Sequence, residues 1–490
     1  MTTTPQTPFA LGNYRPVRDE RTLTTLPVTG RIPAHLDGRY VRNGTNPVAE
    51  IDPATYSWIN GDGMVHGVRL RDGRAEWYRN RWIRTPAIAG ALGERPHPPR
   101  YNAGFTMVAA NTHVFGHADR TLALMEGGFA AYEVTDELDA VGPCDFGGTL
   151  GGGYTGHPKI DPVTGEMHAV SWHLTGGSTV LYSVIGTDGR ARRIVPVRVN
   201  GHPLIHDMGL TARHVLIYDL PAVVDTRAVV DHVVPGWVPW PARLALSVAL
   251  GRVRLPHPLT ALMAPRNPRE YFPAAYRWDA DHPARVGIMP RDGDNGTVRW
   301  FEVDPCYVFH TINAYDDVNT VVCDVVRHAT TGYAGNPDVS GTRPPHTVCR
   351  WTFDLMTGGV TETDLDDLSQ ELPRTDDRRL GRHYRYAYTV NNLLDPARDH
   401  DAVIRRDFRT GTTSERILGP RVRCGEFSFV PNSDDSAEDD GVLIGFTHDE
   451  DRDTSDLTLL DAATLETVAS VHLPYRVPYG FHGNWIPTRR

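Results

Sequence analysis

Four histidines lie far apart in the chain, each inside a short apolar or glycine-bearing segment that is typical of a β-strand. They are His157, His206, His310 and His482. The first two are 49 residues apart and the second and third 104, close to one and two repeats of a propeller blade of about 50 residues. No carboxylate or cysteine is spaced beside them to complete a local metal site. The spacing therefore predicts that four blades each send one imidazole to a common axis, where a metal could bind.

Short β-branched and aromatic runs alternate with turn sequences along much of the chain. The runs at 215–220, 318–326, 351–355 and 457–460 are too short for helices. Glycine-containing sequences typical of hairpin turns lie at 71–74, 187–190, 294–297, 356–359 and 409–412. This pattern predicts an all-β chain folded as a β-propeller. With 490 residues, the chain is long enough for one such domain over 1–490.

Residues 221–276 depart from the strand pattern. A stretch rich in proline and tryptophan leads to Pro241, and the Leu- and Val-rich run that follows predicts a helix that starts at a proline. We interpret the segment as an apolar helical insertion or cap over the axial site. Residues 237–255 allow two interpretations: a patch that contacts a membrane surface or the mouth of an apolar tunnel, and an insertion packed over the propeller face.

The overall composition narrows the class of protein. The formal charge is −10 and the basic residues are dispersed, so we expect no nucleic-acid partner. Lys159 is the only lysine, a usage that we ascribe to coding bias. The five cysteines form no C-x-x-C pair, which favours buried thiols in a reducing compartment over disulfides. The first residues do not resemble a signal peptide and no apolar run reaches 18 residues, so we expect a cytoplasmic protein.

The four imidazoles limit the chemistry of the predicted centre. Four neutral imidazoles would leave a metal its full charge and two open octahedral positions, which suits O2 with a substrate or water better than a closed zinc site. Such imidazoles need acceptors that fix their tautomer. Glu126, Glu371 and Glu426 are candidates because each lies in an apolar segment, where an unpaired carboxylate is costly. Alone, any one of these residues would more simply be a core histidine or a surface glutamate.

Other histidines are left out of the predicted centre. His66 follows a glycine-rich turn sequence and is expected to pack structurally. His168, His173 and His202 are close in sequence to the candidate ligands but at positions that we interpret as polar loops.

Eight short motifs, spread nearly from end to end, resemble the motif series of the carotenoid cleavage oxygenases. They are Asp37-Gly-Arg-Tyr-Val-Arg-Asn-Gly, Asn60-Gly-Asp-Gly-Met-Val-His-Gly, Gly156-His-Pro-Lys-Ile-Asp-Pro, Ile205-His-Asp-Met, Phe309-His, Glu371-Leu-Pro-Arg, Glu426-Phe and Phe481-His-Gly-Asn-Trp. Their order and spacing are more specific than any single motif. The resemblance implies a seven-bladed propeller with an axial Fe(II) held by the four histidines above, three of them oriented by the three glutamates.

The same resemblance implies an Fe(II)-dependent dioxygenase. Such an enzyme adds O2 across a conjugated C=C bond of a carotenoid or apocarotenoid and releases two carbonyl products. Because the substrate is an apolar polyene, specificity is expected from an apolar tunnel rather than from hydrogen bonds. Aromatic residues near the candidate ligands in sequence are the tunnel candidates: Tyr154, Trp172, Tyr307, Phe309, Phe427 and Phe481.

Two alternatives stay open. The first is a stilbene- or phenylpropanoid-cleaving dioxygenase on the same scaffold. Stilbene-cleaving relatives carry a lysine just before the first glutamate, where this chain has Met125, which favours the carotenoid interpretation. The second is a propeller that binds a ligand or partner without chemistry. Gly156 and Leu372 also depart from the residues usual in the family, and either could reshape the substrate cavity.

Overall fold

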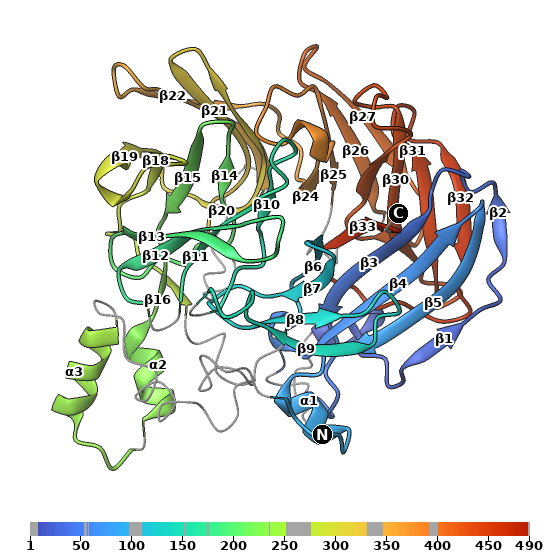
Figure 1. The fold of residues 1–490 in the computed structure, drawn as a ribbon, viewed down its shortest axis with the longest axis horizontal. Helices are drawn as coiled ribbons and strands as arrows, with labels where there is room; N and C mark the ends of the chain where they lie inside the picture. Colours follow the sequence, from blue (N-terminus) through green and yellow to red (C-terminus); the bar gives the residue numbers. More distant parts are fainter. Residues whose placement is uncertain are drawn as a thin grey trace, which may run out of the picture.

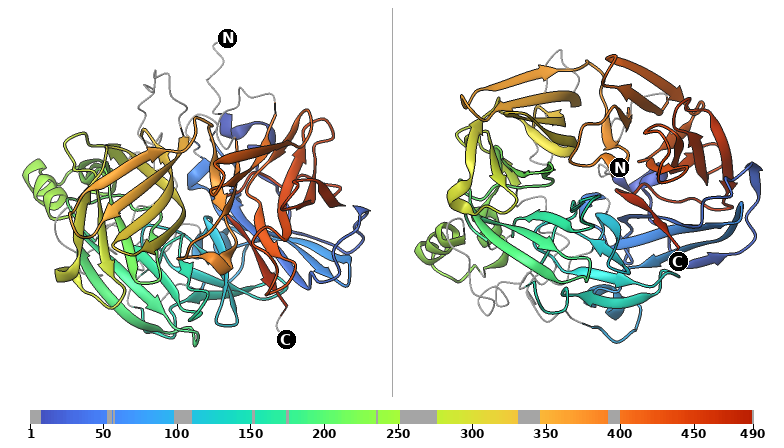
Figure 2. Two further views of the ribbon diagram at one scale, coloured as in Figure 1. Left: turned by 90° about the horizontal axis from the view of Figure 1, so that it is seen from above. Right: turned by 45° about the horizontal axis from the view of Figure 1, so that its top comes forward.

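The computed structural model describes residues 8–52, 56, 58–97, 110–150, 153–173, 176–234, 236–250, 276–330, 346–391 and 400–488. Within these ranges, seven antiparallel sheets follow one another around a ring (Figures 1 and 2). Each sheet is one blade, and its innermost strand faces the centre of the ring. The predicted all-β, seven-bladed propeller is therefore confirmed.

Blades 2 to 6 follow the chain in order, and each consists of four strands. Blade 2 holds β6 (His113–His117), β7 (Arg120–Leu124), β8 (Ala131–Val134) and β9 (Ala140–Cys144); blade 3 holds β10 (Lys159–Ile160), β11 (Met167–Ser171), β12 (Thr179–Ile185) and β13 (Ala191–Arg198); blade 4 holds β14 (Gly209–Leu210), β15 (His214–Asp219), β18 (Arg285–Pro290) and β19 (Arg299–Glu302); blade 5 holds β20 (Tyr307–Asp317), β21 (Thr320–His328), β22 (His346–Asp354) and β23 (Val360–Asp364); blade 6 holds β24 (Glu371–Arg374), β25 (Tyr386–Val390), β26 (Ala402–Asp407) and β27 (Thr412–Ile417).

Blades 1 and 7 each combine strands from both ends of the chain, and this closes the ring. Blade 1 has the order β1 (Arg21–Leu23), β5 (Arg74–Trp82), β4 (Gly63–Arg71), β3 (Gly38–Thr45) and β33 (Gly483–Pro487). Blade 7 has the order β2 (Val28–Gly30), β32 (Thr467–His472), β31 (Thr454–Asp461), β30 (Gly441–Asp449) and β28 (Val422–Cys424), with β29 (Ser428–Pro431) also paired to β30. β33 pairs with β3 along its whole length.

The predicted turns connect neighbouring strands as expected. At 71–74, Asp72 and Gly73 have φ angles of 50° and 71°, the left-handed conformations that a two-residue hairpin turn of type I′ requires. One predicted strand is shifted along the chain. Val318 has a φ of 48° and lies in the turn, so the strand predicted at 318–326 begins at Thr320 instead.

The blades pack against one another through buried apolar side chains. The largest cluster runs across blades 3, 4 and 5 and includes the fully buried Tyr182, Val286 and Trp351. β30 is buried on both faces from Gly441 to His448, as expected for the middle strand of a blade. This close packing fixes where the inner end of each blade points.

The segment 221–276 contains two helices among its described residues. α2 (Thr226–Val233) and α3 (Trp240–Leu250) lie together at the edge of the ring, near the small sheet of β16 (Ala222–Val224) and β17 (Tyr276–Trp278) (Figures 1 and 2). The helix predicted to start at Pro241 is confirmed as α3, which begins one residue earlier, at Trp240. Residues 251–275, including the end of the predicted 237–255 patch, lie outside the described residues, so the role of the segment as a cap stays a prediction.

Within the described residues, the one further helix of at least four residues is α1 (Pro86–Ala91), after β5. No helix in the described ranges is long and apolar enough to span a membrane.

Candidate metal centre

Each of the seven blades contributes one of the seven residues predicted for the centre. Histidines come from blades 1, 3, 4 and 5, and glutamates from blades 2, 6 and 7. Six of these residues lie at or beside the innermost strand of their blade, and Glu126 follows β7, the second strand of blade 2. In blade order the seven are His482, Glu126, His157, His206, His310, Glu371 and Glu426. The ring thus brings together residues that are hundreds of positions apart in the chain.

The four histidines form one compact, buried group. Their ring nitrogens lie within 4.8 Å of one another, and no other set of this kind occurs among the described His, Cys, Asp and Glu residues. All four side chains are buried. The structure therefore gathers the predicted four-histidine group where an ion could bind.

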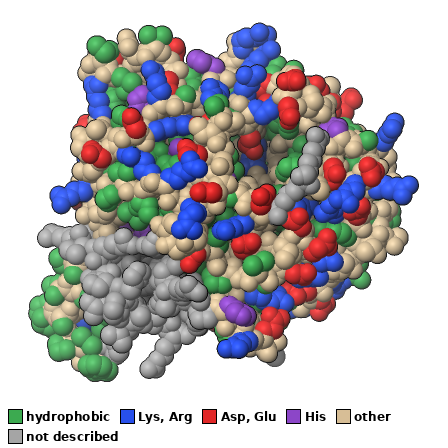
Figure 3. Space-filling model, in the orientation of Figure 1, with side chains coloured by type: hydrophobic (Ala, Val, Ile, Leu, Met, Phe, Trp, Pro, Cys, Tyr) green, Lys and Arg blue, Asp and Glu red, His purple; other side chains and the backbone are tan. Residues whose placement is uncertain are grey.

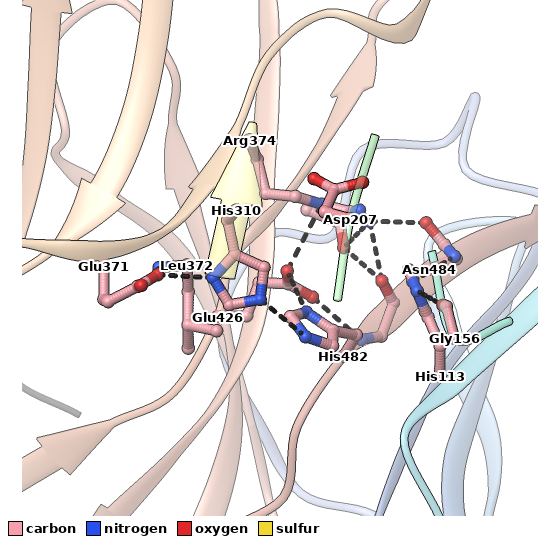
Figure 4. Close-up of polar contacts among 12 residues, drawn as sticks. His113, Gly156, Asp207, His310, Glu371, Leu372, Arg374, Glu426, His482 and Asn484 are labelled. Atoms are coloured by element: carbon pink, nitrogen blue, oxygen red, sulfur yellow. Dashed lines mark hydrogen bonds and ion pairs between the residues drawn. The ribbon is translucent and has the colours of Figure 1, made fainter. Parts of the chain in front are cut away.

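Three of the imidazoles donate Nδ1–H to a carboxylate, and Figure 4 shows two of these pairs, His310 with Glu371 and His482 with Glu426. His206 donates to Glu126 at 2.8 Å, His310 to Glu371 at 2.5 Å, and His482 to Glu426 at 2.9 Å. All three carboxylates are buried. These contacts fix the tautomer in which Nε2 carries the lone pair, which is the form that binds a metal.

The Nε2 atoms of this group fit a cation between them. Those of His310 and His482 lie 3.1 Å apart. If both rings donate Nδ1–H outward, two lone pairs face each other at this distance, which is repulsive unless a cation or a proton lies between them. Nε2 of His157 is buried and has no hydrogen-bond partner in the described structure. The donor set therefore fits a metal that prefers nitrogen ligands.

The charge states of the histidines follow from burial and neighbours. Burial lowers the pKa of His157 well below its usual range, and the surrounding histidines lower it further. Burial also lowers the pKa of His482 to about 4. Burial acts in the same direction on His206, but the Glu126 carboxylate outweighs it, so the pKa of His206 is raised. His157 and His482 are thus uncharged at neutral pH, and each keeps a ring-nitrogen lone pair that could bind a metal.

Glu371 and Glu426 also hold other groups. Glu371 accepts a second imidazole N–H, from His328 Nε2 at 2.5 Å. Glu426 accepts the backbone N–H of Gly483 at 2.8 Å and lies 3.8 Å from the Arg374 guanidinium. Burial alone would raise the pKa of Glu371, but His310 and His328 hold it well below its usual range. The Glu126 side chain, by contrast, has one hydrogen bond in the described structure, the one from His206.

His157 has no carboxylate partner, and its segment is held differently. His113, from the start of β6, donates Nδ1–H to the carbonyl of Gly156 at 2.9 Å. The side-chain amide of Asn484 donates to His113 Nε2 at 3.0 Å. His113 thus joins the residue before His157 to the strand after His482. Sequence reasoning missed His113, because it lies in an apolar strand like several other histidines and has no motif of its own.

An axial cavity of about 310 Å³ reaches the centre from one side. Three of the four histidines line it, together with polar and charged side chains that include Lys159, Asp207 and Arg374. Figure 3 shows the molecule hollowed near the middle of the face seen in Figure 1, with acidic and basic side chains around the hollow. Apolar side chains such as Phe115, Ile160 and Ile312 also line it, so the wall mixes apolar and charged groups, whereas the predicted substrate tunnel is apolar.

None of the six predicted tunnel residues lines the axial cavity. Phe309 packs edge-on against His206, with ring centroids 5.2 Å apart, and Phe481 packs against Trp58 at 4.4 Å. The other four are buried: Tyr154, Trp172, Tyr307 and Phe427. The part of these residues in a tunnel stays a prediction.

The histidines left out of the centre are also buried. His66 is hydrogen-bonded to the Tyr78 hydroxyl at 2.9 Å, as a structural residue would be. Of the other three, only His168 contradicts its assignment to a loop, although none of them is exposed as a polar loop position would be. His168 lies within β11 against the Tyr182 hydroxyl at 2.8 Å. His202 and His173 lie outside strands but are buried, and the ring of His202 bonds the His173 carbonyl. None of them belongs to the four-histidine group.

Comparison with known proteins matches nearly the whole chain to the family that its motifs resemble. The family model described as retinal pigment epithelial membrane protein (RPE65) matches residues 14–487. A carotenoid cleavage oxygenase of Mycobacterium tuberculosis is 51% identical and covers 99% of this chain and 98% of its own. A carotenoid 9,10(9',10')-cleavage dioxygenase 1 of Pisum sativum is 29% identical and covers 97% of this chain and 89% of its own.

Solved structures show the same fold. The lignostilbene dioxygenase of Pseudomonas brassicacearum superposes with a TM-score of 0.80 at 25% identity and covers all of both chains. Cobalt-substituted ACO of Synechocystis superposes with a TM-score of 0.77 at 23% identity and covers 96% of this chain and 97% of its own. From its motifs, its seven-bladed ring and these matches, the chain belongs to the RPE65 and carotenoid cleavage oxygenase family.

Proposed function

We propose that this protein is an Fe(II)-dependent dioxygenase that cleaves a conjugated C=C bond of a carotenoid or apocarotenoid. The observation that carries the proposal is the buried group of four imidazole nitrogens, three of them held by carboxylates. The carotenoid cleavage oxygenase of Mycobacterium tuberculosis, 51% identical over nearly the whole chain, supports the substrate class.

His157, His206, His310 and His482 would hold the iron. When bound, the iron supplies a centre at which O2 is activated beside the alkene. One O2 and one C=C bond give two C=O groups, so the balance needs no proton and no protein nucleophile. Glu126, Glu371 and Glu426 keep three rings in the donor tautomer.

Positioning is the remaining task of the protein. Burial of the four histidines limits the access of water to the centre. The aromatic residues Phe309 and Phe481 lie next to His310 and His482 in the chain and are the tunnel candidates best placed to hold one double bond near the centre. Apolar burial at about 25 cal/mol per Å² would favour a long polyene in such a tunnel.

A stilbene cleaver is the second candidate. The 0.80 TM-score with a lignostilbene dioxygenase favours it. Against it, Met125 directly precedes Glu126 and is buried in an apolar cluster, so it offers a phenolic hydroxyl no charged partner.

A competition experiment separates the two. Protein purified without oxygen and loaded with Fe(II) is mixed with an apocarotenal and a hydroxystilbene, O2 is admitted, and the products are identified by chromatography and mass spectrometry. Apocarotenoid aldehydes would support the proposal and locate the cleaved bond. Benzaldehydes would favour the stilbene cleaver, and the absence of O2-dependent products from protein with full iron content would overturn both.

We also propose that the protein works in the cytoplasm and contacts a membrane surface through α3. Five free, buried cysteines suit a reducing compartment. Trp237 and Trp240 are 82% and 73% exposed, and Figure 3 shows apolar side chains gathered around these helices. Such a patch is typical of a surface that contacts lipid. Cosedimentation with liposomes tests the contact, and binding that is unchanged in Trp237→Ser/Trp240→Ser would contradict it.

A further inference from the structure

The only lysine of the chain lies in the wall of the axial cavity. At every other position with a Lys or Arg side chain the residue is arginine. Residue 159 is thus the one position where the preference for arginine is not followed. Lys159 is the first residue of β10, two residues after His157, and only 17% of its side chain is exposed. Its Nζ lies 2.9 Å from Oδ1 and 3.0 Å from Oδ2 of Asp207. The ammonium of Lys159 therefore contacts both oxygens of one carboxylate.

That carboxylate joins three blades. Asp207 directly follows His206, and its side chain is 1% exposed. Its Oδ1 accepts the N–H of Met208 at 2.7 Å, and its Oδ2 accepts the N–H of Thr311, the residue after His310, also at 2.7 Å. Lys159 supplies the third link, to the segment of His157. Asp207 thus connects the chain segments of three of the four histidines in one contact network.

The contacts suit the compact ammonium of a lysine. Each oxygen of Asp207 accepts one backbone N–H and keeps a further acceptor site. An ammonium, whose three donors turn freely, can approach both oxygens at once while the two backbone donors stay in place.

We propose that the Lys159–Asp207 pair is a positioning element that sets the place of His157 relative to His206 and His310. It takes the part that a carboxylate plays for the other three histidines, because no carboxylate contacts the His157 ring. His113 holds the other side of the same segment through the Gly156 carbonyl. This inference rests on the proposed metal site, since the positions of the rings matter only if they share an ion.

The test compares metal binding with folding stability in matched variants. Lys159→Met keeps the length of the side chain and removes its charge, Asp207→Asn removes the opposite charge, and the double variant Lys159→Met/Asp207→Asn removes both. Asp324→Asn is the control: Asp324 is as buried as Asp207 but pairs with Arg350 in blade 5, away from the four histidines. For each protein, the affinity for Co(II) is measured by competition with a chelator, together with the visible spectrum of the Co(II) form and the melting temperature.

A positioning role predicts a specific pattern. The single variants melt earlier because each leaves a buried charge unpaired, and they bind Co(II) about 10- to 100-fold more weakly. The double variant recovers its melting temperature but keeps the weak affinity and the altered spectrum. The control melts earlier and binds Co(II) as the unaltered protein does.

Two results would count against the proposals, and they are distinguishable. If the double variant regains both stability and Co(II) affinity, the pair only balances charge and the positioning role is wrong. If the unaltered protein binds neither Co(II) nor Fe(II), the proposed metal site itself is wrong. Labelling with ¹⁵N-lysine adds a direct probe, because one lysine gives one Nζ signal. That signal should shift when Co(II) binds, and an unchanged signal would overturn the placement of Lys159 beside the centre.

Discussion

His157 differs from the other three histidines of the centre in how it is held. His206, His310 and His482 each donate Nδ1–H to a glutamate, so a direct hydrogen bond orients the ring. The ring of His157 contacts no carboxylate, and the contacts around it hold its backbone neighbours instead. The centre therefore combines two ways to place a ligand.

The arrangement of the carboxylates accounts for this difference. Three glutamates orient three of the four imidazoles. Glu371 in blade 6 serves the histidine of the preceding blade and Glu426 in blade 7 that of the following blade, whereas Glu126 in blade 2 reaches past blade 3 to His206 in blade 4. His157, in blade 3, is the histidine left without a carboxylate among the described residues, and its segment is held through neighbouring residues instead.

Removal of a histidine is the strongest test of this comparison. We expect His157→Ala and His310→Ala to lose metal affinity by more than about 100-fold, beyond the range of the outer carboxylates, and to lose product formation. The paired and the unpaired histidine should be equally necessary because both are ligands. Metal content by mass spectrometry and aldehyde yield measure this, with His66→Gln as a buried control. Wild-type metal content in His157→Ala would show that only the paired histidines bind.

Removal of a carboxylate should have a smaller effect. We expect Glu371→Gln to weaken metal binding about 10- to 100-fold, and more than Glu126→Gln does, because Glu371 holds His328 as well as His310. Titration against a chelator gives both affinities. Glu362→Gln, which alters a carboxylate that binds Trp351 in blade 5, is the control. Equal losses in the two glutamate variants would show that the bond to His328 has no effect on the centre.

Acid should lower the folding stability of the protein, and buried histidines outside the centre should contribute to this loss. Burial lowers the pKa of His168 and of His202 to about 4 from an ordinary value of 6.5. Between these values the unfolded chain binds protons that the folded chain does not, so stability falls as the pH drops from 6.5 toward 4. Melting temperatures of the metal-free protein across this range measure the loss. His202→Gln should flatten the curve, and a curve that does not change would contradict the assignment.

The smallest loss of metal affinity is expected from a substitution at Gly156, the residue before His157. A Cβ at Gly156 would lie 2.7 Å from Cγ2 of Thr112, so Gly156→Ala must push this side chain aside at a cost of about 1–3 kcal/mol. Because His157 is held through its backbone, metal affinity should fall together with stability. Gly90→Ala in α1 is the control, since no atom lies within 4 Å of its new Cβ. Unchanged affinity in Gly156→Ala would mean that the segment moves without shifting the ring.

The ring and its ligand set could be predicted from local sequence. Hairpin turns such as Asp72-Gly73 determine their own geometry, and the spacing of His157 and His206 matches one blade. The apolar segments of the three glutamates marked them as candidate acceptors, and the resemblance to the family then supplied the number of blades and their match to three of the histidines. These features depend on residues that are close together in the sequence or on motifs that recur within a family.

Contacts between blades could not be predicted in the same way. The sequence places Asp207 beside His206 and Lys159 near His157, but their ion pair depends on how blades 3 and 4 meet. His113 resembles His117 in sequence, since both lie in β6, yet only His113 reaches Gly156. The link of Glu126 to His206 across blade 3 has the same origin. Partners of this kind follow from the packing of the whole ring.

The pairing of β33 with β3 has a consequence for synthesis on the ribosome. The strand that closes blade 1 begins at Gly483, directly after His482. A nascent chain that has not yet released these residues lacks both the last of the four proposed ligands and the closure of the ring. If the four histidines hold a metal, its loading must wait until translation of this strand is complete, because a chain that stops before His482 is open and cannot assemble the centre. Metal retention would thus distinguish finished molecules from prematurely terminated ones.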